Sequence, residues 1–275
     1  MSSCAAEADP LGAARRLRDT AGQADAALAC YDRALALTPD ARTGAGLYFE
    51  LAALAHSNGR VAVLERSLRA SVRLLPAFGD GHFELGNTLH SQNRYAEAVG
   101  SFDMALRQEQ LGDRGMVYNN LANALTEVGH EQRAERAYAQ GLRLVPRGST
   151  AAFLLNGLAN QQSARGRDDE AVATIERALR VQPVAHYAAF NLGNFLRRLK
   201  RIPEAEHTYR RALAAEPSDA RYVQGLGTVL HEAGRAQEAV TQGSRRDATL
   251  ARQTRAPSII PMCLPQLSFL SAPHV

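Results

Sequence analysis

Four asparagines recur along the middle of the chain at nearly even spacing, with steps of 36, 37 and 34 residues. They are Asn87, Asn123, Asn160 and Asn194. An asparagine side chain carries one carbonyl acceptor and one NH2 donor, so it can bond both the N–H and the C=O of an extended peptide. A row of such amides would hold a polypeptide without reading its side chains. The alternative is that these amides are solvated or bond a neighbouring helix.

More amides and several aromatic side chains lie a few residues away and would extend this row. The further asparagines are Asn119, Asn120, Asn156 and Asn191. The aromatic candidates are Phe153, Tyr187 and Phe190. Aromatic side chains beside backbone-binding amides would provide apolar contacts and specificity for a peptide. We expect Phe49 and Phe83, by contrast, to be partly packed between helices.

Motifs for catalysis are absent from the sequence. It contains no G-x-x-x-x-G-K-[ST] phosphate loop, no H-E-x-x-H and no G-x-S-x-G. His56 and His90 occupy position 12 in neighbouring repeats and His231 repeats it later, but the pair formed by His56 and His90 has no third metal ligand. We therefore expect no enzymatic activity, no cofactor and no metal site.

The elements that would position the asparagines are repeats of two sequence blocks. One block reads "HFELGNTLHSQNR" from His82 and "AFNLGNFLRRLKR" from Ala189. The second block has a small residue at its centre, and this residue recurs at steps of 37, 34, 36, 37, 34 and 34. The residues at this point are Ala27, Leu64, Ala98, Ala134, Ala171, Ala205 and Ala239. A period of 34 that tolerates short insertions is typical of paired-helix repeats.

A 34-residue frame makes the pattern explicit. Position 8 is small, position 20 is alanine in six of seven repeats, position 24 is bulky and position 27 is small again. Glycine follows the first block at Gly22, Gly59, Gly129, Gly166 and Gly234. Proline follows the second block at Pro39, Pro76, Pro146, Pro183 and Pro217. Glycine and proline at these points predict the ends of the first and second helix of each repeat.

On these residues the chain resembles a tetratricopeptide repeat protein from residue 8 to residue 240. The resemblance implies an all-α fold, an α-solenoid wound as a right-handed superhelix. About six full helix pairs and a truncated seventh are expected. Abundant alanine, an aromatic content of 6% and no tryptophan agree with an all-α chain. The resemblance also implies a concave groove lined mainly by the first helices, with positions 2, 5, 9 and 12 facing it.

Two known functions of the family can be compared with these residues. The co-chaperones of the family grip a terminal carboxylate with lysine at position 5 and a basic pair two repeats later. This chain has Phe83 and then Phe153 and Gly157 at those places, so we expect no carboxylate-clamp adaptor. The elements "NLGN" and "LANAL" resemble the repeat region of O-linked N-acetylglucosamine transferases, in which an asparagine ladder holds substrate polypeptides.

These observations predict a non-enzymatic scaffold or adaptor that binds a peptide segment of a partner protein in the groove. The alternative is a detached substrate-recognition region of such a glycosyltransferase without its catalytic domain. Nucleic acid is not an expected partner. Residues 241–275 carry four arginines and one acid, so the formal net charge of +4 leaves the preceding residues nearly neutral.

Location and the C-terminal region complete the predictions. Cys4, Cys30 and Cys263 lie far apart, which argues against a disulfide framework and favours a reducing compartment. The first eleven residues hold no apolar run of the signal-peptide kind. The longest apolar stretch, 259–270, is too short to span a bilayer. We expect a cytoplasmic protein, with the nucleus possible, and no membrane partner. Residues 241–275 contain four prolines and are expected to form an irregular, poorly ordered tail.

Overall fold

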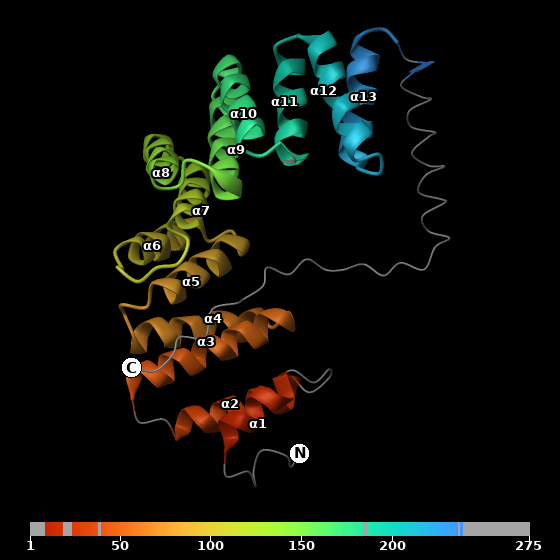
Figure 1. Cartoon of the computed structure of the whole chain (residues 1–275). Coiled ribbons are helices and arrows are strands. Elements are labelled where there is room, and N and C mark those ends of the chain that lie inside the picture. The colour runs from red at the N-terminus through yellow and green to blue at the C-terminus, as the bar shows by residue number, and fades with distance from the viewer. Residues whose placement is uncertain (1–8, 19–23, 38–39, 184–185, 236, 239–275) are drawn as a thin grey trace, which may run out of the picture. The chain divides into compact units, whose positions relative to one another are not determined.

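The computed structural model describes residues 9–18, 24–37, 40–183, 186–235 and 237–238. Within these ranges the chain forms thirteen α-helices and no β-strand (Figure 1), which confirms the all-α prediction. The helices are α1 (Pro10–Arg18), α2 (Ala24–Ala36), α3 (Ala41–Ser57), α4 (Val61–Leu74), α5 (Gly79–Ser91), α6 (Tyr95–Leu106), α7 (Arg114–Glu127), α8 (Glu131–Leu144), α9 (Gly148–Ala164), α10 (Asp168–Val181), α11 (His186–Arg198), α12 (Ile202–Ala215) and α13 (Ala220–Glu232).

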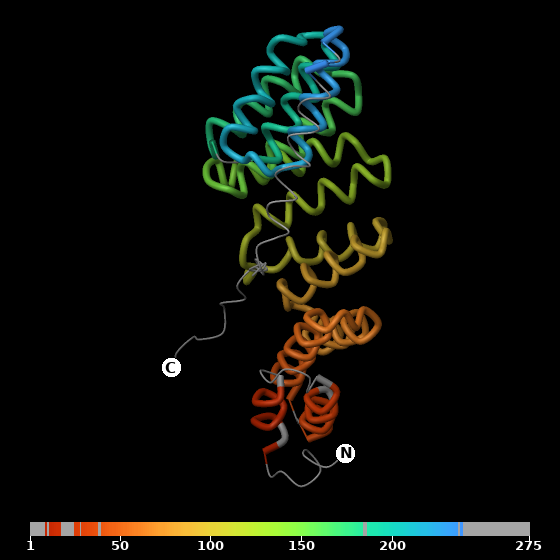
Figure 2. The backbone as a smooth tube through the Cα atoms, turned by 90° about the vertical axis from the view of Figure 1, so that its right-hand side faces the viewer, coloured from red at the N-terminus to blue at the C-terminus, as the bar shows by residue number. Residues whose placement is uncertain are grey.

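The chain divides into two compact units, Met1–Phe195 and Leu196–Val275. In the first unit, α1 to α10 pack as five consecutive pairs, and the second helix of each pair contacts the first helix of the next. Figure 2 follows this succession from α1 (red) to α10 (green). In the second unit, α12 packs against α13. The helix order confirms the predicted α-solenoid, and α13 is the first helix of a seventh repeat. Residues 241–275, where we predicted an irregular tail, lie outside the described residues.

The repeat signature forms the core, because its small and bulky positions pack against each other. The bulky residues at position 24 have at most 1% of their surface exposed. They are Tyr31, Leu68, Phe102, Tyr138, Ile175 and Tyr209. The alanines at position 20 are also fully buried wherever the structure describes them, whereas Leu64 at this position is half-buried. Burial of these side chains is the main term that stabilises each helix pair.

Glycines in the first helices allow these bulky rings to approach closely. A Cβ on Gly86 would lie 2.5 Å from Cε1 of Phe102, and one on Gly157 would lie 2.6 Å from Cε1 of Tyr138. Gly86 occupies position 8, as predicted for close approach of the two helices. Gly227 occupies the same position in α13, and there a Cβ would meet nothing within 4 Å. The second helix of this seventh repeat lies outside the described residues, so the prediction of a close approach stays a prediction there.

The first helix of each repeat ends in a left-handed residue. Gly59, Gly129, Gly166 and Gly234 have φ between 67° and 77°, which confirms their predicted role, while Gly22 lies outside the described residues. The next residue donates its N–H to the carbonyl five positions earlier, as Arg167 N does to Gln162 O at 2.9 Å. This is the Schellman ending of a helix. Two repeats reach the same conformation without glycine, and they are described next.

Asn93 and Lys200 stand at this turn in the third and sixth repeats, each with φ of 60°. Asparagine tolerates the left-handed region, whereas lysine is strained there. The second helices also end as predicted. In α4, α8, α10 and α12 the last helical residue precedes a proline by two positions; the prolines are Pro76, Pro146, Pro183 and Pro217. Pro39 lies outside the described residues.

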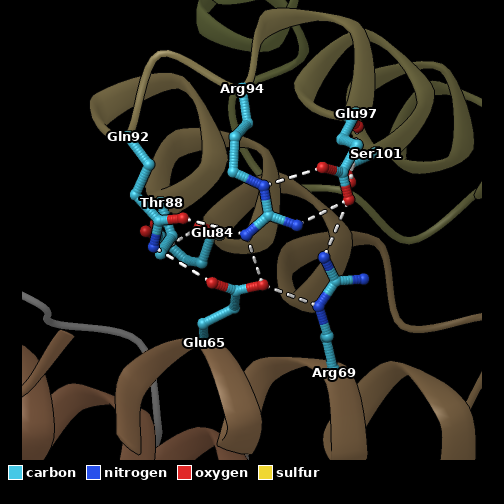
Figure 3. A network of polar contacts seen from close by, with 8 residues as sticks. All are labelled: Glu65, Arg69, Glu84, Thr88, Gln92, Arg94, Glu97 and Ser101. Atoms are coloured by element: carbon cyan, nitrogen blue, oxygen red, sulfur yellow. Dashed lines mark hydrogen bonds and ion pairs between the residues drawn. The ribbon is translucent and has the colours of Figure 1, made fainter. Parts of the chain in front are cut away.

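An ion network joins successive repeats on the side of the second helices (Figure 3). The Arg94 guanidinium, directly after Asn93, donates to Glu65 of α4 at 2.7 Å and makes two 2.7 Å bonds to Glu97 of α6. Arg69 of α4 bridges the same two carboxylates at 2.9 Å each. Arg94 and Arg69 lower the pKa of the exposed Glu97 carboxyl to about 2. The network therefore ties α4 to α6 across the turn.

The same arrangement recurs at two more of the arginines that follow the left-handed turn. Arg167 bonds Glu135 of α8 and pairs with Glu170 of α10 at 3.1 Å. Arg235 pairs with Glu206 of α12 at 2.7 Å and with Glu238 at 2.6 Å. Arg94, Arg167 and Arg235 at position 16 thus link the second helix of one repeat to the start of the next second helix. At the same position, Arg60 pairs with Asp25 of α2 and Arg201 pairs with Glu204 of α12.

Cys30 of α2 is fully buried and disulfide-bonded, although we expected no disulfide framework from the spacing of the cysteines. Spacing alone led us to that expectation, but spacing along the chain does not set the distance in the folded protein. Because disulfides persist mainly in oxidising environments, the cysteines do not support a reducing compartment. The cytoplasmic or nuclear location stays a prediction. None of the helices in the described part of the chain is long and apolar enough to cross a membrane.

Candidate functional site

The predicted amides lie on four successive first helices. Asn87 lies on α5, and α7 carries Asn119, Asn120 and Asn123. The remaining amides are Asn156 and Asn160 on α9 and Asn191 and Asn194 on α11. We refer to these eight side chains as the amide row. Helix α9 contains no charged side chain, so Asn156 and Asn160 are the polar groups that it contributes to the amide row.

The first part of the amide row is a chain of hydrogen bonds from α5 to α7. Asn119 Nδ2 donates to Asn120 Oδ1 at 3.1 Å, and Asn120 Nδ2 donates to Asn87 Oδ1 at 2.8 Å. Asn87 Nδ2 reaches Glu84 Oε2 at 3.4 Å. Each amide therefore has its orientation fixed by a neighbour. The interpretation that these asparagines bond an adjacent helix is confirmed for Asn87 and Asn120.

A second bond of the same kind joins α9 to α11. Asn191 Nδ2 donates to Asn156 Oδ1 at 2.8 Å, between residues 35 apart in sequence. Asn123 is held differently, because its Oδ1 accepts a 2.6 Å bond from the hydroxyl of Tyr138 in α8. Burial raises the pKa of this tyrosine above its ordinary value. Asn87, Asn123, Asn156 and Asn191 are all half-buried, which leaves part of each amide accessible.

Asn160 differs from the other members of the amide row. It is exposed on α9, and its side chain has no hydrogen-bond partner among the described residues. Asn194 is half-buried on α11. Asn160 is therefore the amide that is most available to another molecule, and a substitution there would change least within the fold.

Two of the predicted aromatic residues form a stacked pair. The rings of Phe153 in α9 and Tyr187 in α11 lie 4.9 Å apart between centroids, at an interplanar angle of 13°. Phe153 remains 39% exposed, which is unusual for so large an apolar side chain on a first helix. Phe190, also on α11, is half-buried. Phe153 precedes Asn156 by one turn of α9, and Tyr187 precedes Asn191 by one turn of α11. The aromatic pair therefore presents an apolar surface next to the bonded asparagines.

The other two aromatic residues pack inside the fold, as predicted. Phe49 contacts Phe78 edge to face at 5.0 Å between centroids, and Phe83 contacts Phe102 at 6.1 Å. Both are partly buried against the same core cluster. They therefore belong to the packing between helices rather than to an accessible surface.

Position 6 of the first helix carries the predicted Asn120 and Asn191, and in two earlier repeats it carries glutamates that we did not single out from the sequence and that have different surroundings. Glu50 of α3 pairs with Arg15 of α1 at 2.5 Å and accepts a 2.9 Å bond from the Tyr31 hydroxyl. Glu84 of α5 is half-buried, and its bond from Asn87 is long. Burial raises the pKa of the Glu84 carboxyl above its ordinary value; Asn87 and His56 oppose this shift and Asp80 adds to it. The sequence does carry a sign of these two residues, because position 6 is a glutamate in two successive repeats.

Of the histidines at position 12, His56 lies within electrostatic range of Glu84, whereas His90 contacts an aromatic ring. The ring of His90 packs edge to face on Tyr95, with centroids 5.0 Å apart. In the described ranges, no three side chains of the histidine, cysteine, aspartate or glutamate type are grouped so that they could hold a metal ion.

Comparison with known proteins identifies the repeats. The tetratricopeptide repeat model matches residues 51–111, 156–209 and 196–247, which together make up more than half of the chain. No curated protein sequence matches at a significant level. Tetratricopeptide repeats are protein–protein interaction modules.

Three solved structures illustrate the likeness of the fold. A tetratricopeptide repeat protein from Parabacteroides merdae is 19% identical, with a TM-score of 0.60, over 73% of this chain and 78% of that one. The type IV pilus biogenesis factor PilW is 17% identical, with a TM-score of 0.64, over 80% and 96%. YrrB, described as a tetratricopeptide repeat protein with an unusual peptide-binding site, is 17% identical, with a TM-score of 0.50, over 65% and 89%. The chain belongs to the tetratricopeptide repeat family.

Proposed function

We propose that this protein is a non-enzymatic scaffold that binds an extended segment of a partner protein along the amide row and the Phe153–Tyr187 pair. The observation that carries the proposal is the exposed, unbonded amide of Asn160 on an uncharged helix that also presents the exposed ring of Phe153. An amide can bond a passing main chain, and a stacked aromatic pair can hold an apolar side chain of the same segment.

The bonds within the amide row support this proposal rather than weaken it. An asparagine that donates one N–H to a neighbour keeps its second N–H and one carbonyl lone pair. The bonds from Asn120 to Asn87 and from Asn191 to Asn156 fix the direction of these remaining groups. Side chains that are already ordered lose less conformational entropy when a ligand binds. The row is therefore suited to bind a main chain at low entropic cost.

The test compares the full chain with single variants as baits for proteins from a cell extract. Asn160→Ala and Phe153→Ala each remove a group that the fold does not use heavily, and Leu144→Ala serves as the control, since Leu144 is an exposed apolar residue of α8, a second helix. We expect Asn160→Ala and Phe153→Ala to lose the same set of bound proteins, and Leu144→Ala to retain it. If all four baits hold the same proteins, binding does not use this face and the proposal fails.

The glycosyltransferase alternative would use the same amides for a substrate polypeptide. It stays a prediction, as does the absence of catalytic activity. A gene in which these repeats continue into a nucleotide-sugar-binding domain would favour the transferase alternative over an independent scaffold. The expectations that nucleic acid, membranes and chaperone tails are not partners also stay predictions.

A further inference from the structure

The two glutamates at position 6 differ in one respect that points to a ligand. In α3, the carboxylate of Glu50 receives its cation from within the chain, because Arg15 of the preceding first helix reaches it. Arg15 occupies position 8 of α1. In α3, the first helix that precedes Glu84, the residue at position 8 is the buried Ala52, which cannot supply a charge. Glu84 stands where Glu50 stands, yet no arginine or lysine of the described chain pairs with it. Glu84 therefore lacks the cation that the fold supplies to its counterpart.

The surroundings of Glu84 in the described chain offer no arginine or lysine as a partner. On α5 itself the charged side chains are the acids Asp80 and Glu84, with His82 and His90 as the basic types. Arg114 at the start of α7 is engaged by the backbone carbonyls of Leu106 and Gln108, at 2.5 and 2.8 Å. His56 of α3 is the group of positive character that lies within electrostatic range of Glu84. The nearby arginines Arg69 and Arg94 already pair with Glu65 of α4. In Figure 3 no dashed line joins either of them to Glu84.

We infer that Glu84 receives a lysine or arginine side chain of the bound segment, so that the partner of the amide row is an extended peptide with a basic residue. The inference rests on the proposed function and deepens it. Asn87 and Asn120, which are bonded to each other directly beside Glu84, would hold the peptide main chain next to this residue. A half-buried carboxylate forms a stronger charge-assisted bond than an exposed one, because water competes less with the incoming cation.

The cost of keeping Glu84 ionised in the fold is consistent with a binding role for this carboxylate. Burial raises the pKa of Glu84, so the ionised carboxylate opposes folding at neutral pH instead of favouring it. Glu84→Gln keeps the shape and removes the charge. We therefore expect this variant to be at least as resistant to heat as the native chain, and a loss of binding in it will not come from unfolding.

The experiment begins with a phage-displayed library of random dodecapeptides selected on the full chain. Recovered peptides are synthesised with a fluorescent label, and fluorescence anisotropy then gives their dissociation constants. We expect a shared lysine or arginine at one place in the recovered sequences. Replacement of this residue by glutamine, or Glu84→Gln in the protein, should each weaken binding about tenfold or more, and the two changes together should weaken it little further.

Two further variants complete the design. Glu176→Gln, in the exposed surface of α10, removes the same charge from a second helix and should leave the dissociation constant unchanged. Glu84→Lys should restore binding of a peptide whose basic residue is replaced by glutamate. Recovered peptides that bind equally well with and without the basic residue would overturn the inference and leave the proposed function intact. Recovery of no binding peptide at all would contradict both.

Discussion

The hydroxyl of Tyr138 in α8 donates a 2.6 Å hydrogen bond to Oδ1 of Asn123 in α7, so a member of the amide row also holds the core of its own repeat. Tyr138 is 1% exposed. Asn123→Ala would remove the carbonyl that accepts this buried bond, at a cost of about 1 kcal/mol in the free energy of unfolding.

This relationship gives the first prediction. Urea denaturation should show that Asn123→Ala is clearly less stable than the native chain, whereas Asn160→Ala is within about 0.5 kcal/mol of it. Tyr138→Phe combined with Asn123→Ala should recover part of the loss, since no polar group is then left unpaired. Equal stability of the two alanine variants would mean that the bond contributes nothing to folding.

The second prediction concerns the approach of Gly86 to Phe102. A methyl group on Gly86 would overlap the ring, so Gly86→Ala should destabilise the fold by about 1–3 kcal/mol. Gly100, on the neighbouring helix α6, offers a matched control because a Cβ there meets nothing within 4 Å. Alanine favours a helix interior over glycine by about 0.5–1 kcal/mol, so Gly100→Ala should raise the melting temperature while Gly86→Ala lowers it.

The third prediction uses the left-handed turn after the first helices. Lys200 adopts φ of 60° and its ion pair with Glu232, at 3.5 Å, is largely exposed. Lys200→Gly should therefore stabilise the fold, by up to about 1 kcal/mol. Gly166→Ala, at the same turn with φ of 74°, should destabilise it by a similar amount. Differential scanning calorimetry of both variants tests this, and a shift of the same sign in both would contradict it.

The fourth prediction concerns acid. Arg94 and Arg69 lower the pKa of Glu97 to about 2 from the ordinary 4.5. A carboxyl with a lowered pKa stabilises the fold above pH 4.5, and this contribution disappears as the pH falls towards 2. Glu97→Gln should thus melt at a lower temperature than the native chain at pH 6, and the difference should vanish near pH 2. Glu176→Gln is the control, for which we expect no such convergence.

The repeat pattern was sufficient to predict the helices, their order and most of the core. Alanine at position 20 and bulky residues at position 24 recur in the sequence because every repeat makes the same contact, so the period alone locates the core. Glycine at position 15 likewise predicts the left-handed turns. It could not predict that Asn93 and Lys200 adopt the same conformation, since there the neighbouring repeat structure imposes a turn that the residue itself does not favour.

The candidate site was predicted less completely. The frame placed the asparagines on the correct helices, but which amide bonds which depends on the offset between adjacent helices and on side-chain rotamers. Nothing in the sequence distinguishes Asn160, which is unbonded, from Asn123, which holds Tyr138. The importance of Glu84 was missed because it becomes visible only by comparison with Glu50 and the arginine that reaches it. The disulfide bond of Cys30 depends on distances in the folded chain and could not be read from spacing.

The arginines at position 16 have a consequence for how the chain unfolds. If one repeat opens, Arg94 or Arg167 loses partners on two second helices at once, so the opening of one repeat weakens its neighbour and unfolding spreads along the stack. His130 replaces this arginine in the fourth repeat, and among the described residues the ion pair between α6 and α8 is Arg133 with Asp103, at 3.1 Å and largely exposed. Between α6 and α8 this arginine link is therefore replaced by a single exposed ion pair, and amide hydrogen exchange tests whether the helices on its two sides open separately.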